Sequence, residues 1–220
     1  MAILLYCVTS AESAPVNITN GVCESEVQAF QVGRIRFYAS TPIDPEVCLA
    51  TPNLLRQAGL QFSQILREIL LATTPIPFPF PALLESEEAA KSFISAREAQ
   101  YYGELQRLSG TLQYELYASW EAEQQTDTST PIKGSEYLRR RQTQDSRVAA
   151  LDEKLRKVTG NSVREWRMRQ DRKTHHWFAL VEREQREKFL ELLRGAGSSG
   201  SVRLRLRGPS PPEEFVQLST

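Results

Sequence analysis

Residues 202–216 read VRLRLRGPSPPEEFV, and this stretch decides the fold. Its first half alternates apolar and basic residues, which predicts a half-buried strand over Val202–Arg207. Proline lacks a backbone N–H and fixes φ, so the part from Gly208 to Pro212 cannot continue as a helix or as a central strand. We therefore expect an extended tail that carries Phe215 onto another part of the fold.

Working back from this strand, the second half of the chain has a regular order of elements. The order is strand, helix, strand, strand, helix, strand, which resembles the ferredoxin-like split βαβ arrangement. Val163–Gln170 fits either a strand or an irregular segment, and the polar stretch Glu121–Thr130 is typical of a loop. The other expected elements are a strand over Leu112–Ala118, a helix from Ser135 to Val158, a central strand over Trp177–Val181, a helix over Glu182–Leu193 and a turn over Gly195–Gly200.

The first half also mixes strands with helices. Ile3–Val8 predicts a buried strand, and Val27–Tyr38 predicts two short strands that meet near Gly33. An amphipathic helix begins at Pro52 and ends before Pro75, and a second helix is expected over Glu87–Leu108. Between them, alternating prolines in Pro75–Pro81 predict an extended segment bound through its side chains and not through its backbone.

Length and composition fit two small domains better than one large one. The chain has 220 residues, enough for two cores. We predict an α+β protein with an N-terminal α+β domain at residues 1–109, a ferredoxin-like βαββαβ domain with extra helices at 110–207, and a Pro-rich docking tail at 208–220.

The charge balance, the cysteine spacing and the short apolar N-terminal segment argue against several classes of protein. Lys plus Arg and Asp plus Glu are both 27, so the overall positive charge of a nucleic-acid binder is missing. Cys7, Cys23 and Cys48 form no C-x-x-C pair, which suits reduced cytosolic thiols. The apolar segment Ala2–Val8 is too short for a signal or membrane helix.

No residue pattern predicts catalysis, a metal or a cofactor. His175 and His176 are adjacent, so on a strand they point to opposite faces and cannot both reach one metal. The sequence has no G-x-S-x-G, G-x-G-x-x-G or phosphate-binding loop. We therefore expect a binding protein and not an enzyme.

Two sets of side chains are candidates for binding a partner. Arg139, Arg140 and Arg141 beside Tyr137 could hold phosphate or a partner's carboxylates, although a solvated helix face is the favoured interpretation of this cluster. Aromatic residues, Phe78 and Phe80 among them, could stack on bases as in an RNA-binding sheet, but core packing is the favoured interpretation because the RNA-binding signatures are missing. A ferredoxin-like nucleic-acid or protein binding module stays open as an alternative.

Several segments, in order, make the chain resemble the gas vesicle protein family GvpL/GvpF over nearly its whole length. They are Pro75–Pro81 followed by the helix from Glu87, then Gly134–Arg141, then Phe178–Val181, and finally Gly208–Pro212 with Phe215. The family normally has arginine where this chain has Pro79, and tryptophan where it has Ser210. Both departures remove a large side chain.

The resemblance implies an accessory protein without catalysis. It implies support of gas vesicle assembly, in the cytoplasm or on the vesicle, through binding of the hydrophobic shell protein and other accessory proteins. We expect no cofactor, no nucleic acid and no membrane. The partner-binding residues expected on this basis are Phe78, Phe80, Tyr137, Arg139, Arg140, Arg141, Pro211 and Phe215.

Overall fold

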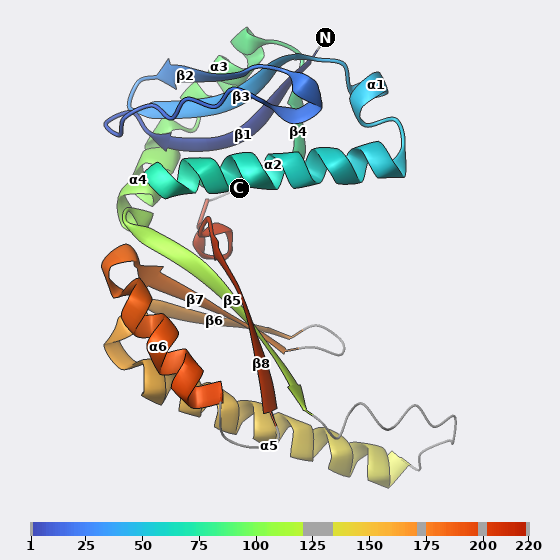
Figure 1. Cartoon of the computed structure of the whole chain (residues 1–220), viewed down its shortest axis with the longest axis vertical. Coiled ribbons are helices and arrows are strands. Elements are labelled where there is room, and N and C mark those ends of the chain that lie inside the picture. The colour runs from blue at the N-terminus through green and yellow to red at the C-terminus, as the bar shows by residue number, and fades with distance from the viewer. Residues whose placement is uncertain (1, 121–133, 171–174, 198–201, 219–220) are drawn as a thin grey trace. The chain divides into compact units, whose positions relative to one another are not determined.

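The computed structural model describes residues 2–120, 134–170, 175–197 and 202–218 (Figure 1). Within these ranges the chain forms two compact units. The first comprises Met1–Leu112 together with Ser210–Thr220, and the second comprises Gln113–Pro209. The C-terminal segment therefore groups with the N-terminal part of the chain.

The first unit is built on a sheet of four antiparallel strands. They are β1 (Ala2–Ser10), β2 (Val27–Val32), β3 (Ile35–Ile43) and β4 (Ile76–Leu84), in the order β2-β3-β1-β4. All residues of β1 from Ile3 to Thr9 are buried, which is what a strand covered on both faces requires. The predicted strand over Ile3–Val8 and the two strands meeting near Gly33 are confirmed.

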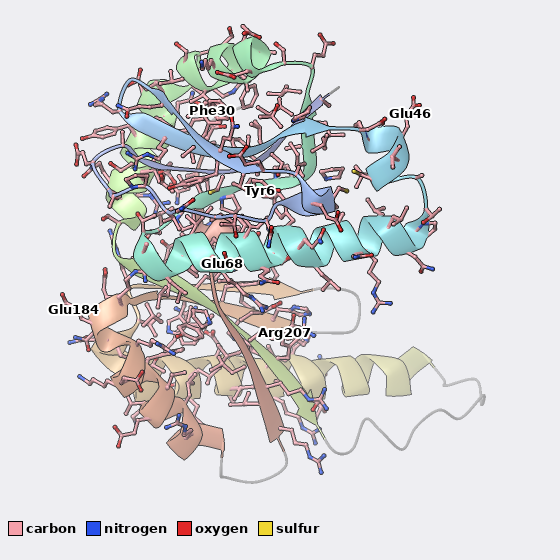
Figure 2. All side chains as sticks on the ribbon, turned by 45° about the horizontal axis from the view of Figure 1, so that its top comes forward. Tyr6, Phe30, Glu46, Glu68, Glu184 and Arg207 are labelled. Atoms are coloured by element: carbon pink, nitrogen blue, oxygen red, sulfur yellow. The ribbon has the colours of Figure 1, made fainter. Side chains whose placement is uncertain are left out.

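Helices cover both faces of this sheet. One face meets α2 (Pro52–Ala72), and the other meets α3 (Glu87–Ser95) and α4 (Glu98–Leu108), while the short α1 (Pro45–Cys48) precedes α2 (Figure 1). Helix α2 begins where the sequence predicts, because the Thr51 hydroxyl accepts from the Leu54 N–H at 3.3 Å. Tyr6, labelled in Figure 2, lies between the sheet and α2, with its ring 5.1 Å from that of Phe62.

Two predictions for this unit need correction. The Pro75–Pro81 segment does pair through its backbone: β4 is an edge strand of the sheet, where a missing N–H is tolerated. The single helix predicted over Glu87–Leu108 is two helices, because Arg97 leaves the helical region at φ −122° and ψ 11°. Phe93 before this break and Tyr101 after it both pack against the ring of Phe78.

The second unit has a four-stranded sheet and two long helices. Its strands are β5 (Thr111–Trp120), β6 (Glu165–Gln170), β7 (His175–Glu182) and β8 (Val202–Ser210), in the order β6-β7-β5-β8. Helices α5 (Gly134–Thr159) and α6 (Arg186–Gly197) pack against each other (Figure 1). Trp177, Tyr114 and Phe189 are the largest fully buried side chains among the described residues of this unit.

Most predictions for this unit are confirmed. Trp177–Val181 lies in a central strand, and Val163–Gln170 contains the strand β6. The predicted helix over Glu182–Leu193 starts later, at Arg186, after a short 3₁₀ turn over Arg183–Gln185, and runs on to Gly197. The predicted loop Glu121–Thr130 and the end of the turn over Gly195–Gly200 lie outside the described residues.

Candidate functional site

The C-terminal tail delivers Phe215 into the first unit. After Pro211 and Pro212, both buried, the chain makes a 3₁₀ turn over Glu213–Phe215. The Phe215 side chain is 0% exposed. The expectation that the tail carries this ring onto another part of the fold is therefore confirmed.

An ion pair on α4 holds the tail in place. Arg107 donates from Nε to Glu104 Oε1 at 3.0 Å and from Nη2 to Oε2 at 2.7 Å, so the pair is bidentate. Arg107 Nη2 also donates to the backbone carbonyl of Phe215, while Glu104 Oε2 accepts from the Gln217 N–H at 2.8 Å. These two residues, here called the α4 clamp, bind the backbone directly after the Phe215 side chain, on either side of Val216.

Phe78 and Phe80 lie on one strand but pack against different helices. Phe80 contacts Phe62 of α2 with ring centroids 5.1 Å apart, whereas Phe78 contacts Phe93 of α3 and Tyr101 of α4, each at 6.1 Å. The register explains this difference: Leu5 pairs with Ala82 and Cys7 pairs with Pro77. Only Tyr6 lies between the two β1 residues, but the segment 78–81 lies between the two β4 residues, so the strand bulges there.

The basic cluster cannot be placed at the level of side chains. The α5 backbone begins at Gly134, which agrees with a helix start near Ser135. The side chains of Tyr137, Arg139, Arg140 and Arg141 lie outside the described part of the structure. Their predicted role therefore stays a prediction.

The last strand presents its arginines to solvent. Arg203, Arg205 and Arg207 of β8 are exposed, as the alternating pattern predicts, but Leu206 on the other side is also 40% exposed. Arg207, labelled in Figure 2, donates to the Tyr117 hydroxyl at 3.0 Å and lies 4.7 Å from the centre of that ring. Burial, followed by contact with Glu115, raises the pKa of Tyr117.

Two pairs of titratable side chains among the described residues contact each other, His176 with Glu115 and Cys23 with Cys48. His176 Nδ1 lies 2.9 Å from Glu115 Oε1, whereas His175, the next residue along β7, is buried. Burial, and then contact with Cys48, raises the pKa of Cys23 to about 12, so its thiol is a poor nucleophile at neutral pH.

Two features are absent from the described ranges. They contain no group of three or more His, Cys, Asp or Glu side chains that could hold a metal ion. Nor does any helix among them have the length and apolar character needed to cross a membrane.

The α4 clamp is the part of the site that sequence reasoning missed. Glu104 and Arg107 are three positions apart on a helix, a spacing that is common for exposed ion pairs. The sequence could indicate this ion pair only together with the tail, because a tail expected to dock needs hydrogen-bond partners for its backbone groups.

Comparison with known proteins gives one consistent result. No curated protein sequence matches the chain. The crystal structure of gas vesicle protein GvpF from Microcystis aeruginosa aligns over 99% of this chain and 99% of its own, with 16% identity and a TM-score of 0.75. That of GvpF from Anabaena sp. PCC7120 aligns over 100% of this chain and 97% of its own, with 16% identity and a TM-score of 0.76.

These two similarities establish the fold, an α+β arrangement with two antiparallel four-stranded sheets. The family model described as gas vesicle synthesis protein GvpL/GvpF matches residues 2–217, which is almost the entire length and includes the tail and the α4 clamp. The chain belongs to the GvpL/GvpF family of gas vesicle synthesis proteins.

Proposed function

We propose that this protein supports gas vesicle assembly as an accessory protein that binds the hydrophobic shell protein and other accessory proteins. The observation that carries the proposal is the family match over residues 2–217. On this proposal the protein works without catalysis or a cofactor, in the cytoplasm and on the vesicle, and binds neither nucleic acid nor membrane.

The proposed architecture is two domains, residues 1–109 and 110–207, with a docking tail at 208–220. We propose that the second domain is ferredoxin-like. Its order along the chain, β5-α5-β6-β7-α6-β8, and the adjacent central position of β5 and β7 support this assignment.

The proposed contact with the shell protein involves the edge strand β4. Its prolines remove backbone donors, so a partner cannot extend the sheet there and has to bind side chains. Phe78 and Phe80 are half-buried and would present their exposed edges to apolar segments of the partner. This arrangement would shield the partner's apolar surface before it polymerises.

The remaining candidate residues have two different proposed roles. Tyr137 and Arg139–Arg141 would provide charge complementarity that selects the partner. Pro211 and Phe215 are buried, so their proposed contribution is to hold the tail in the arrangement that the partner recognises.

Co-purification with the shell protein tests this function. The full-length chain is co-expressed with the shell protein, and binding is compared with that of a chain truncated after Arg207. We expect binding by the intact chain and its loss on truncation. Absence of binding by an intact chain with native circular dichroism would refute the function.

Charge selection is tested separately, at low and high salt. Alanine at Arg139, Arg140 and Arg141 is expected to weaken binding most at low salt, since salt screens exposed charges. Lys157→Ala is the matched control, because it removes an exposed cation from the same helix. Salt-dependent retention on RNA by the wild-type chain would favour a nucleic-acid binding module instead.

A further inference from the structure

Two of the three cysteines lie against each other in the first unit. Cys23 is in the 3₁₀ turn Val22–Glu24, Cys48 is the last residue of α1, and the two thiols are hydrogen-bonded to each other although β2 and β3 separate them in the sequence. Cys23 and Leu49, the residue after Cys48, also pack against the same hydrophobic core. Both thiols are half-buried, so a small molecule in solvent can reach them. None of the roles proposed above uses this pair.

The backbone on each side holds its sulfur in place. Cys23 has a φ of 59°, a conformation that a residue other than glycine keeps only where its surroundings fix it, and its N–H donates to Gln61 Oε1 of α2 at 3.3 Å. The Cys48 N–H donates to the Asp44 carbonyl oxygen at 2.9 Å. The Asp44 carboxylate caps the same short helix by accepting from the Glu46 N–H at 3.0 Å. The two sulfur atoms are therefore held together before any reaction, which gives each a high effective concentration at the other.

The third cysteine is kept apart from this chemistry by its position. Cys7 lies inside β1 and is 0% exposed. Burial raises the pKa of the Cys7 thiol, so its reactive thiolate form is scarce at neutral pH. The first unit therefore contains two thiols that can react with each other and one that serves as an internal control.

We propose that Cys23 and Cys48 form a reversible disulfide when the chain meets a small-molecule disulfide such as glutathione disulfide. The Cys48 thiolate attacks one sulfur of the oxidant, which forms a mixed disulfide and releases one glutathione thiolate. Cys23 then attacks the Cys48 sulfur, which forms the bond between the two cysteines and releases the second glutathione thiolate. The protons of the two protein thiols pass to the two released thiolates, so one disulfide is reduced as the other forms.

The surroundings of the pair set this order of attack. Burial, followed by contact with Cys48, raises the pKa of Cys23 to about 12, so this thiol keeps its proton at neutral pH. The first attack therefore falls to Cys48. Once Cys48 carries the glutathionyl group it has no ionisable thiol, so it no longer raises the pKa of Cys23, which then acts as the resolving thiol.

The new bond would restrain two connections of the first unit. The turn that holds Cys23 precedes β2, α1 precedes α2, and both contact α2. A bond between them closes a loop around the β2–β3 hairpin, which restricts the unfolded chain. We expect the thermal midpoint of this unit to rise by at least about 5 °C and to return on reduction with dithiothreitol, and an unchanged midpoint would refute the restraint. The proposal does not rest on the gas vesicle role.

The test treats the intact, reduced chain with glutathione disulfide and counts its thiols in denaturant. The count should fall from three to one, on a monomer that has lost the mass of two hydrogens. Digestion with the protease Glu-C assigns the bond, because cleavage after Glu12, Glu24 and Glu46 places each cysteine on a separate peptide. The peptides that contain Cys23 and Cys48 should be joined, and the peptide that contains Cys7 should stay free.

Substitutions separate the two steps. Cys23→Ser should stop at the mixed disulfide, with one glutathionyl group on Cys48. Cys48→Ser should react at least about tenfold more slowly, because burial, the larger cause of the raised pKa of Cys23, remains. Cys7→Ala is the matched control: it removes a thiol from the same unit and should form the bond at a rate within about twofold of the wild type.

Three results would overturn the proposal. A count that stays at three thiols would show that the pair does not oxidise. Disulfide-linked dimers in place of the monomer would mean that the thiols react between chains and not with each other. Equal rates of mixed-disulfide formation in Cys23→Ser and Cys48→Ser would contradict Cys48 as the attacking thiol.

Discussion

Replacing Phe215 by alanine should destabilise the first unit as strongly as a substitution deep in its core. The ring is 0% exposed although it lies close to the chain end, and Phe→Ala changes in cores cost about 3 to 5 kcal/mol. The α4 clamp binds backbone atoms of the tail, which alanine retains, so the clamp should not add to this cost. With a urea m-value of about 2 kcal/mol/M, the midpoint should fall by about 1.5 to 2.5 M.

Urea unfolding monitored by two spectroscopic signals identifies which unit loses stability in Phe215→Ala. All three tryptophans, Trp120, Trp166 and Trp177, belong to residues 113–209, so tryptophan fluorescence reports the second unit. Far-UV circular dichroism reports both units. In Phe215→Ala we expect the circular dichroism transition of the first unit to move to lower urea, while the fluorescence transition of the second unit stays in place.

Two variants serve as controls, and one outcome decides. Phe215→Leu should cost less than alanine because it keeps more of the buried volume. Glu213→Gln, exposed in the same turn, should change stability by less than about 0.5 kcal/mol. A cost of Phe215→Ala below about 1 kcal/mol would refute a docked tail.

Three further predictions test other contacts of the fold. Arg107→Ala should cost about 1 to 3 kcal/mol and speed proteolysis of the tail, because it leaves the Glu104 carboxylate, which is 13% exposed, without its bidentate partner. An unchanged rate of proteolysis would argue against the α4 clamp. Burial raises the pKa of Cys7 above its ordinary 9.0, so above pH 9.0 the unfolded chain releases a proton that the folded chain keeps, and the free energy of unfolding falls as pH rises. In urea titrations of Cys7→Ala this fall should be less steep by about 1.4 kcal/mol per pH unit, and equal slopes for the variant and the wild type would contradict the burial of Cys7. Gly208→Ala should cost more than about 2 kcal/mol, since φ is +121° and a Cβ would lie 2.8 Å from the Gln113 carbonyl oxygen. Gly103→Ala, which has open space on α4, should instead stabilise by about 0.5 to 1 kcal/mol, and similar thermal midpoints for the two variants would rule out backbone strain at Gly208.

The elements that periodicity predicts well are those whose pattern has one cause. Helix α2 has a capping threonine, a proline in its first turn and one buried face, and its limits follow from these. Strand β7 is apolar because it is covered in the middle of its sheet.

Predictions fail where two causes act on the same residues. In Pro75–Pro81 the prolines argue against a strand, but position at the sheet edge removes the objection. In Glu87–Leu108 the helical spacing continues through Ala96 and Arg97, and only the backbone angles of Arg97 reveal the break between the two helices. Neither the edge position nor this break is visible in the local sequence.

The candidate site divides in the same way. Phe215 could be predicted because an aromatic residue after a run of prolines needs a place to pack. Glu104 and Arg107 could not be identified as its clamp, since an ion pair three positions apart on a helix is ordinary until the tail is placed beside it. A pocket lined by Leu116 of β5, Leu190 and Leu193 of α6, and Leu204 and Leu206 of β8 joins three elements, so it follows from topology and not from the β8 sequence alone.

The prolines have a further consequence for a protein proposed to handle a polymerising partner. Each sheet has one edge strand that contains proline: β4 carries Pro77, Pro79 and Pro81, and β8 carries Pro209. A strand edge with free N–H groups would be a template for adding another chain, whereas proline interrupts that row of donors. Exposed Arg203, Arg205 and Arg207 on β8 oppose edge pairing by charge as well. On the proposed function, a partner would therefore meet β4 and β8 through side chains and not by strand addition, whereas the other two edge strands, β2 and β6, contain no proline.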